Sequence, residues 1–158
     1  MRTIDDWFAS YAESHQNKTN KRIHFICVPL IFWSVLALLW SIPVPGLFES
    51  YHLNWALLAL MAVLAWYTFL SPALAIGMLL ICYLLLPLNA QLEPLLQESF
   101  GLSLWAFALM VFVLAWIGQF IGHRIEGRKP SFFTDLAFLL IGPLWILHFV
   151  YKSWGIKQ

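Results

Sequence analysis

Hydrophobic residues in this chain fall into long runs that are separated by short polar segments. A helix that crosses the apolar core of a bilayer needs about 20 predominantly apolar residues. Four runs approach or reach this length, and the breaks between them contain Pro, Gly or clusters of polar residues. The pattern therefore predicts four transmembrane helices, at residues 23–42, 53–70, 73–88 and 102–121.

A fifth apolar stretch covers residues 132–151 but is interrupted in three places. It contains Asp135, a Gly142-Pro143 pair and His148. A charged residue and a helix-breaking pair weaken the case for a membrane span. This stretch either spans the bilayer or folds as a re-entrant or interfacial hairpin.

The polar segments define the expected connections. Residues 43–52 and 89–101 are expected to be loops, and Ser71-Pro72 leaves room only for a tight turn. Before the first run, apolar residues recur every three or four positions, which predicts an amphipathic helix on the membrane surface. These residues are Ile4, Trp7, Phe8 and Tyr11. Thr3 is the expected N-cap of this helix, since Asp6 stands three residues later.

Composition agrees with the hydropathy pattern. The chain has 158 residues, of which 61% are hydrophobic and 11% charged, and its mean hydropathy is +0.77. Soluble domains average about 45–50% apolar and about 25% charged residues. The sequence therefore predicts one all-α domain, residues 1–158, in the membrane: a compact bundle of four transmembrane helices with the N-terminal amphipathic helix and the fifth segment.

The basic residues predict the orientation in the membrane. Three precede the first run and three follow the fourth, whereas the loops at 43–52 and 89–101 contain none. Four spans place all six on one side, which should be cytoplasmic. The six residues are Lys18, Lys21, Arg22, Arg124, Arg128 and Lys129. The net charge of only +1 gives no long-range field to attract nucleic acid.

Two polar clusters adjoin these membrane segments on the same side. The first polar cluster, residues 15–24, contains His15, Asn17, Asn20 and His24. On one straight helix, the nine-residue spacing would place the two histidines on opposite faces. If both serve one site, the chain must break between them, and Asn20 is a plausible N-cap for the following helix.

The second polar cluster, residues 119–126, ends the fourth run. Gln119, His123 and Glu126 are spaced i, i+4 and i+7, so they share one helix face, which Trp116 extends toward the membrane. Gly122 would allow another helix or a ligand to come close to His123. Polar groups at the end of a membrane segment are costly unless they find partners, so we expect the two clusters to meet.

Three histidines that meet on one side favour a metal site with His15, His24 and His123 as ligands. Other polar side chains would hold these ligands or complete the set; they are Asn17, Asn20, Gln119, Glu126 and His148. His52 falls on the opposite side, and Cys27 and Cys82 lie in apolar runs as expected of core residues. Imidazole ligands with a carboxylate nearby suit iron, zinc or manganese, and spacing alone does not choose among them. Cations available to a substrate carboxylate are Lys21, Arg22 and Arg124.

The combined pattern resembles a known membrane family, that of the fungal 2-hydroxy fatty acid dioxygenases and their bacterial relatives. The matching residues are His15-x-Asn17-x-x-Asn20-x-x-x-His24, Val28-Pro29, Gln119-Phe120-x-Gly122-His123, Glu126 and Pro130. The resemblance covers nearly the whole chain, including the number of spans and the Gly-Pro pair in the last segment.

The resemblance implies an Fe(II)-dependent enzyme of fatty acid α-oxidation in the bacterial inner membrane. It would use O2 to shorten a long-chain 2-hydroxy fatty acid by one carbon, with His15, His24 and His123 matching the family's histidines. The residues by themselves leave other functions open. One is a zinc-dependent membrane hydrolase with Glu126 as general base; others are a lipid-binding membrane protein without catalytic activity and a bis-histidine haem carrier.

Overall fold

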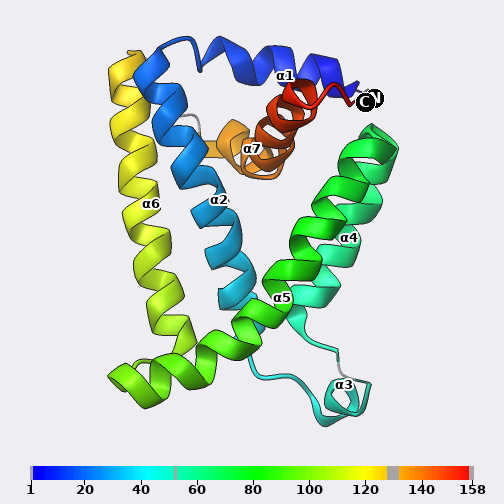
Figure 1. Cartoon of the computed structure of the whole chain (residues 1–158), viewed down its shortest axis with the longest axis vertical. Helices are drawn as coiled ribbons and strands as arrows, with labels where there is room; N and C mark the ends of the chain where they lie inside the picture. The colour runs from blue at the N-terminus through cyan, green and yellow to red at the C-terminus, as the bar shows by residue number, and fades with distance from the viewer. Residues whose placement is uncertain (1, 52, 128–131, 157–158) are drawn as a thin grey trace.

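The computed structural model describes residues 2–51, 53–127 and 132–156, with the side chains of residues 49 and 132–136 outside that description. The described residues form seven helices and confirm the all-α prediction. The helices are α1 (Ile4–Glu13), α2 (Lys18–Trp40), α3 (Gly46–Ser50), α4 (Trp55–Leu70), α5 (Pro72–Phe100), α6 (Leu104–Glu126) and α7 (Phe132–Ser153) (Figure 1).

Three of these helices, α2, α5 and α6, are long and apolar enough to cross a membrane. Helix α4 and the Ala137–Ser153 part of α7 are apolar but shorter. Each predicted transmembrane segment thus corresponds to a helix. The chain has the helices of an integral membrane protein, and the number that cross the bilayer stays a prediction.

The helix starts follow from local capping. Thr3 and Asp6 form the predicted capping box of α1, because each side chain accepts a hydrogen bond from the other's backbone N–H. Helix α2 begins earlier than predicted. Asn17, not Asn20, is its N-cap and accepts hydrogen bonds from the N–H groups of Thr19 and Asn20. Asn20 lies inside the helix and is fully buried.

The predicted loop at residues 89–101 was wrong, because α5 continues to Phe100 and ends at Gly101, whose φ is +63°. The loop was predicted from polar residues and Pro94. These polar residues lie on an amphipathic helix whose apolar side packs Leu92 and Leu96 against Leu104. Helix α5 bends near its middle, so its C-terminal part runs across the base of the bundle (Figure 1).

Helix α7 is continuous through Gly142-Pro143, so the predicted break was wrong. Two tyrosine hydroxyls join it to neighbouring helices. Tyr67 of α4 donates to the carbonyl of Leu140, and Tyr151 of α7 donates to the carbonyl of Ala73 in α5, at 3.1 Å. In Figure 1, α7 stays in the upper half of the molecule near α1 and does not approach the end where α3 lies.

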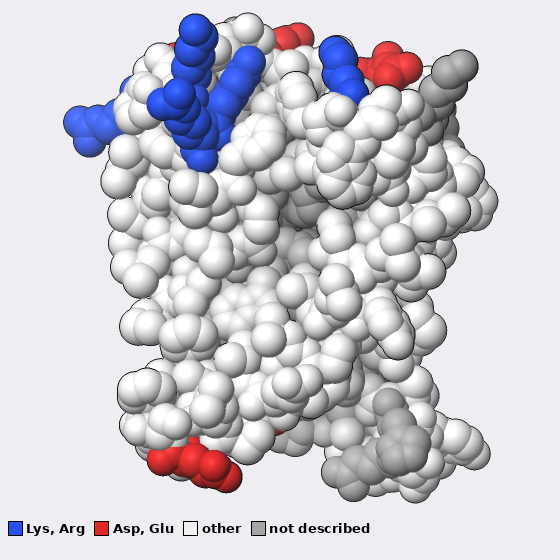
Figure 2. All heavy atoms as spheres, viewed as in Figure 1, with Lys and Arg blue, Asp and Glu red and all other residues white. Residues whose placement is uncertain are grey.

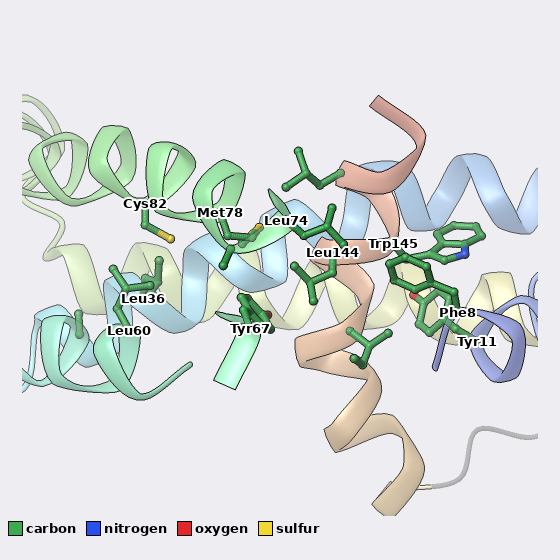
Figure 3. Packing of buried hydrophobic residues seen from close by; sticks show 14 residues of the cluster. Phe8, Tyr11, Leu36, Leu60, Tyr67, Leu74, Met78, Cys82, Leu144 and Trp145 are labelled. Carbon is green, nitrogen blue, oxygen red and sulfur yellow. The ribbon is translucent and has the colours of Figure 1, made fainter. Parts of the chain in front are cut away.

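The main hydrophobic core joins α1, α2, α4, α5 and α7. Figure 3 shows its side chains meeting between these helices, with Tyr67 and Leu144 near the centre and Phe8, Tyr11 and Trp145 toward α1. Packing α1 into this core fixes the position of the turn that follows it. That turn contains His15 and Asn17, the start of the first polar cluster.

Candidate metal centre

The structure brings together the three histidines that the sequence singled out. His15 lies in the turn between α1 and α2, His24 in α2, and His123 near the end of α6. Each offers a ring nitrogen, and these atoms all lie within 4.8 Å of one another. His15 and His24 are 1% and 2% exposed. The arrangement suggests a metal site, since neutral imidazoles are common metal ligands.

The hydrogen bonds fix where the protons lie on His15 and His24. His15 Nδ1 is 2.6 Å from the carbonyl oxygen of Tyr11, which can only accept, so Nδ1 carries the proton. His15 Nε2 therefore presents a lone pair, and His24 Nδ1, 2.9 Å away, donates to it. This leaves a lone pair on His24 Nε2, a buried atom that has no hydrogen-bond partner in the described part of the chain. A metal ion would satisfy that atom.

Burial also keeps His15 neutral. Removal from water lowers the pKa of His15 to about 4, and this effect outweighs the hydrogen bond to the Tyr11 carbonyl, which acts in the opposite direction. At neutral pH the ring is therefore uncharged, as a metal ligand must be.

Tyr11 supports both of these histidines, a role that the sequence analysis did not assign. Its ring stacks on His15 with centroids 4.0 Å apart, and its hydroxyl lies 3.4 Å from His24 Nδ1. The hydroxyl is thus a second acceptor for the His24 proton if a metal engages His15 Nε2. The sequence feature that could have indicated this role is the i, i+4 spacing of Tyr11 and His15, which places the Tyr11 carbonyl one helical turn before the His15 ring.

Glu126 connects the two polar clusters through hydrogen bonds. Its carboxylate accepts hydrogen bonds from the backbone N–H of Gln16 at 2.8 Å, the backbone N–H of Asn17 at 3.0 Å, and the Asn20 side-chain amide at 2.8 Å. Asn20 also donates to the carbonyl of Ser14. These contacts hold the turn that contains His15 against the end of α6.

Close helix packing brings His24 and His123 within reach of each other. Added Cβ atoms at Gly118 and Gly122 of α6 would collide with Cys27 and Asn20 of α2. Small residues four apart allow two helix backbones to approach closely. Gly122 thus provides the close approach expected next to His123.

A cavity of about 40 Å³ adjoins the histidines. One water needs about 10–15 Å³, so the space accommodates an ion with two or three small groups. Its polar lining consists of Tyr11, His15, His24, Trp116, Gln119 and His123. Its apolar lining consists of Val28, Ile31, Phe138 and Leu139.

The other candidate residues lie elsewhere. Lys21, Arg22 and Arg124 are not among the cavity's lining residues, and the two arginines are exposed. His148 packs on Phe8, with ring centroids 5.0 Å apart, and lines a separate groove with Asp5, Ser71 and Lys152. Cys27 and Cys82 are free and buried, as expected of core residues. His52, Arg128 and Lys129 lie outside the described residues.

Comparison with known proteins identifies the family. The profile of the family described as "2-hydroxy-palmitic acid dioxygenase Mpo1-like" matches residues 1–154. The chain belongs to this family. The chain is also similar to the 2-hydroxy-palmitic acid dioxygenase MPO1 of Saccharomyces cerevisiae, with 28% identity over 145 residues. The matched region covers 90% of this chain and 76% of the yeast protein. No solved structure matches the chain. Family membership confirms the resemblance that was based on the residues of the two polar clusters.

Proposed function

We propose that this protein is an Fe(II)-dependent dioxygenase that shortens a long-chain 2-hydroxy fatty acid by one carbon. The observation that carries the proposal is the buried cluster of His15, His24 and His123 beside a partly apolar cavity, in a chain of this dioxygenase family. The substrate class follows the printed name of the family and of the yeast relative.

The three histidines fit a resident metal ion. His24 Nε2 is a buried, unpartnered nitrogen, and Tyr11 fixes the ring of His15 so that Nε2 faces the cluster. Imidazole nitrogens suit iron, and three protein ligands leave coordination positions open for small molecules. Iron(II), when bound, would supply the chemistry that activates O2.

The surrounding residues would bind and orient the substrate. A 2-hydroxy acid offers its hydroxyl and one carboxylate oxygen as a chelating pair, while its acyl tail requires apolar surroundings. Val28, Ile31 and Leu139 provide an apolar wall next to the histidines for the start of such a tail. The wall also limits the access of water to the reacting groups.

The charge distribution supports a cytoplasmic site. On the face shown in Figure 2, Lys and Arg gather at the end where α1 lies, and the charges at the opposite end are acidic. The histidines lie at the basic end, close to Lys21 and Arg124 in the chain. Basic residues mark the cytoplasmic side of membrane proteins, so we place the site at the cytoplasmic face of a bacterial inner membrane.

Anaerobic purification with metal analysis, followed by assay with 2-hydroxypalmitic acid and O2, tests this function. We expect about one iron per chain and an acid product one carbon shorter. A balanced reaction consumes one O2 and releases one CO2 and one water per acid. Substrate labelled at C1 should therefore release labelled CO2 in step with O2 uptake. Tightly bound zinc without O2 uptake would contradict the proposal.

The hydrolase alternative finds less support in the geometry. A zinc hydrolase would need Glu126 as a free general base beside a metal-bound water. The Glu126 carboxylate instead accepts three hydrogen bonds from Gln16, Asn17 and Asn20. It is also absent from the residues lining the cavity.

A further inference from the structure

Besides His24, two residues that line the cavity carry a buried polar atom with no hydrogen-bond partner among the residues that the structure describes. These atoms are the side-chain oxygen of Gln119 and the indole nitrogen of Trp116. Gln119 is only 5% exposed. Native proteins satisfy most buried polar groups, because an unsatisfied one costs about 1–3 kcal/mol. Two such atoms on one cavity wall therefore point to a ligand that pairs with them.

The placement of these residues relates them to the histidines. Trp116, Gln119 and His123 are spaced i, i+3 and i+7 along α6, so they share one face. At 1.5 Å per residue, Gln119 stands about 6 Å and Trp116 about 10 Å from His123 along the helix axis, toward the middle of the membrane segment. A ligand held at the histidines would extend past both side chains.

The position of Trp116 is set by its aromatic neighbours. Its ring packs on Phe112 and Phe120, with centroids 6.1 and 5.6 Å apart. A ring held between two neighbours one turn away on either side has little freedom to turn its N–H toward another partner. Two cavity-lining residues of α6 thus carry a buried donor, on Trp116, and a buried acceptor, on Gln119.

We propose that Gln119 and Trp116 form a recognition pair for the polar head of the substrate: Gln119 pairs with the 2-hydroxyl group and Trp116 donates to a carboxylate oxygen. The inference rests on the proposed function and deepens it. A 2-hydroxy acid carries a hydroxyl donor next to a carboxylate acceptor, which complements the two unpartnered atoms. Among the residues that the structure describes, no Lys or Arg lines the cavity, so neutral hydrogen bonds take the place of an ion pair.

The pair would explain selection for the hydroxylated acid. A site that hydrogen-bonds a substrate hydroxyl rejects the analogue without it, because its own buried group then stays unpaired. Palmitic acid keeps the carboxylate but lacks the hydroxyl. We therefore expect Gln119 to set the preference between the two acids, and Trp116 to set the affinity for both.

The test measures binding without turnover. Fe(II)-loaded protein in lipid nanodiscs is titrated under anaerobic conditions with 2-hydroxypalmitic acid and with palmitic acid. We expect the wild type to bind the hydroxy acid roughly 10–100-fold more tightly. Gln119→Leu should reduce this ratio about tenfold, to the preference that chelation of the metal alone provides, with palmitic acid affinity unchanged. Trp116→Phe should weaken the binding of both acids about tenfold and leave the ratio of their affinities unchanged.

Iron content and ligand-free stability distinguish recognition from a structural role. Both variants should retain iron, and their melting temperatures without ligand should be equal to or above that of the wild type, because each loses an unsatisfied buried group. Trp33→Phe is the matched control: its indole N–H donates to Asn89, so this change should lower the melting temperature and leave the binding ratio alone. Gln119→Met replaces Gln119→Leu if the latter does not fold.

Three results would overturn the recognition pair: a wild type without preference for the hydroxy acid, a Gln119→Leu variant that keeps the wild-type ratio, or variants destabilised as much as Trp33→Phe. The last result would mean that ordered water satisfies the two atoms. Failure of the proposed function is a separate observation. A wild type that discriminates between the acids anaerobically but consumes no O2 would disprove the dioxygenase and leave the recognition pair standing.

Discussion

Two groups of buried polar side chains in the helix bundle differ in how their hydrogen-bonding atoms are satisfied. Toward the α3 end, Trp33 of α2 donates to the side-chain oxygen of the fully buried Asn89 of α5, at 2.9 Å. The donor and acceptor satisfy each other, and the bond ties two long helices together. Toward the α1 end, three histidines, a glutamine and a tryptophan share one small cavity.

The comparison shows which feature marks a site. An unpartnered atom is not sufficient by itself, because the buried amide nitrogen of Asn89 also has no partner among the described residues. At the α1 end three such atoms, on His24, Trp116 and Gln119, belong to residues lining the same cavity. Their convergence indicates a ligand, whereas the Trp33–Asn89 pair indicates packing.

The largest effect should follow the loss of a histidine ligand. His15→Ala, His24→Ala and His123→Ala should each abolish metal binding and turnover, because two remaining nitrogens hold an ion poorly. Metal per chain after dialysis, measured by mass spectrometry, checks this outcome. His148→Ala is the matched control, since His148 lines a different groove. Metal loss in that variant equal to the loss in the other three would mean that the site lies elsewhere.

The stability of metal-free protein should depend on pH through His15. Its pKa of about 4 in the folded protein lies below the ordinary value of about 6.5. Between these values the unfolded chain takes up a proton that the folded protein does not. Stability should therefore be complete above pH 6.5 and fall as the pH drops toward 4, by about 3 kcal/mol in total.

Unfolding free energies of metal-free protein between pH 7.5 and 4 measure this dependence. His15→Gln should remove the corresponding part of the slope, while His148→Ala should keep it. An unchanged slope in His15→Gln would show that the burial of this imidazole does not set the pH response of the site.

Local patterns in the sequence predicted most of the helices and the clustering of the three histidines. Long apolar runs located α2, α4 and α6, and polar residues beside such runs singled out His15, His24 and His123. The same rule failed at residues 89–101, since polar residues after Pro87 also suit an amphipathic helix. Gly142-Pro143 did not end α7, because tertiary packing overrode the local preference.

Roles that depend on distant contacts were harder to predict. Glu126 was expected near the metal, yet it binds the turn at Gln16 and Asn17, about 110 positions away in the sequence. Its helix-face spacing with His123 gave its approximate location but not its partner. Tyr11 was predicted only as part of an apolar stripe. Hydrophobic periodicity locates its ring but gives no information on the partners of its hydroxyl and carbonyl groups.

Glu126→Gln should weaken the metal site without destroying it. The substitution replaces one carboxylate oxygen by an NH2 group that faces N–H donors, so the turn carrying His15 loosens. Metal affinity should fall about 10–100-fold, as is typical when groups that orient ligands are changed. Competition with a chelator gives the affinity, and Glu98→Gln, an exposed change at the α3 end, is the control.

Hydrogen exchange sharpens this prediction. Because Glu126 joins the two polar clusters without a metal, chelation of the wild type should increase exchange only modestly in residues 15–24 and 119–126. Chelation of Glu126→Gln should increase exchange strongly in both segments together. Strong loosening of chelated wild type would indicate that the metal, rather than Glu126, holds the clusters together.

The smallest effect should come from the Trp33–Asn89 pair, where the comparison predicts a change in stability and none in chemistry. Asn89→Leu leaves the indole N–H of Trp33 buried without its acceptor, which should lower the unfolding free energy by about 1–3 kcal/mol. Adding Trp33→Phe removes the donor as well, so the double variant should recover most of that loss. Both variants should keep wild-type metal content and turnover.

Denaturant titration in detergent, with metal analysis in parallel, measures unfolding free energy and metal content on one preparation. Reduced metal binding in Asn89→Leu at unchanged stability would contradict this prediction. It would mean that the Trp33–Asn89 pair supports the metal site and not the packing of α2 against α5.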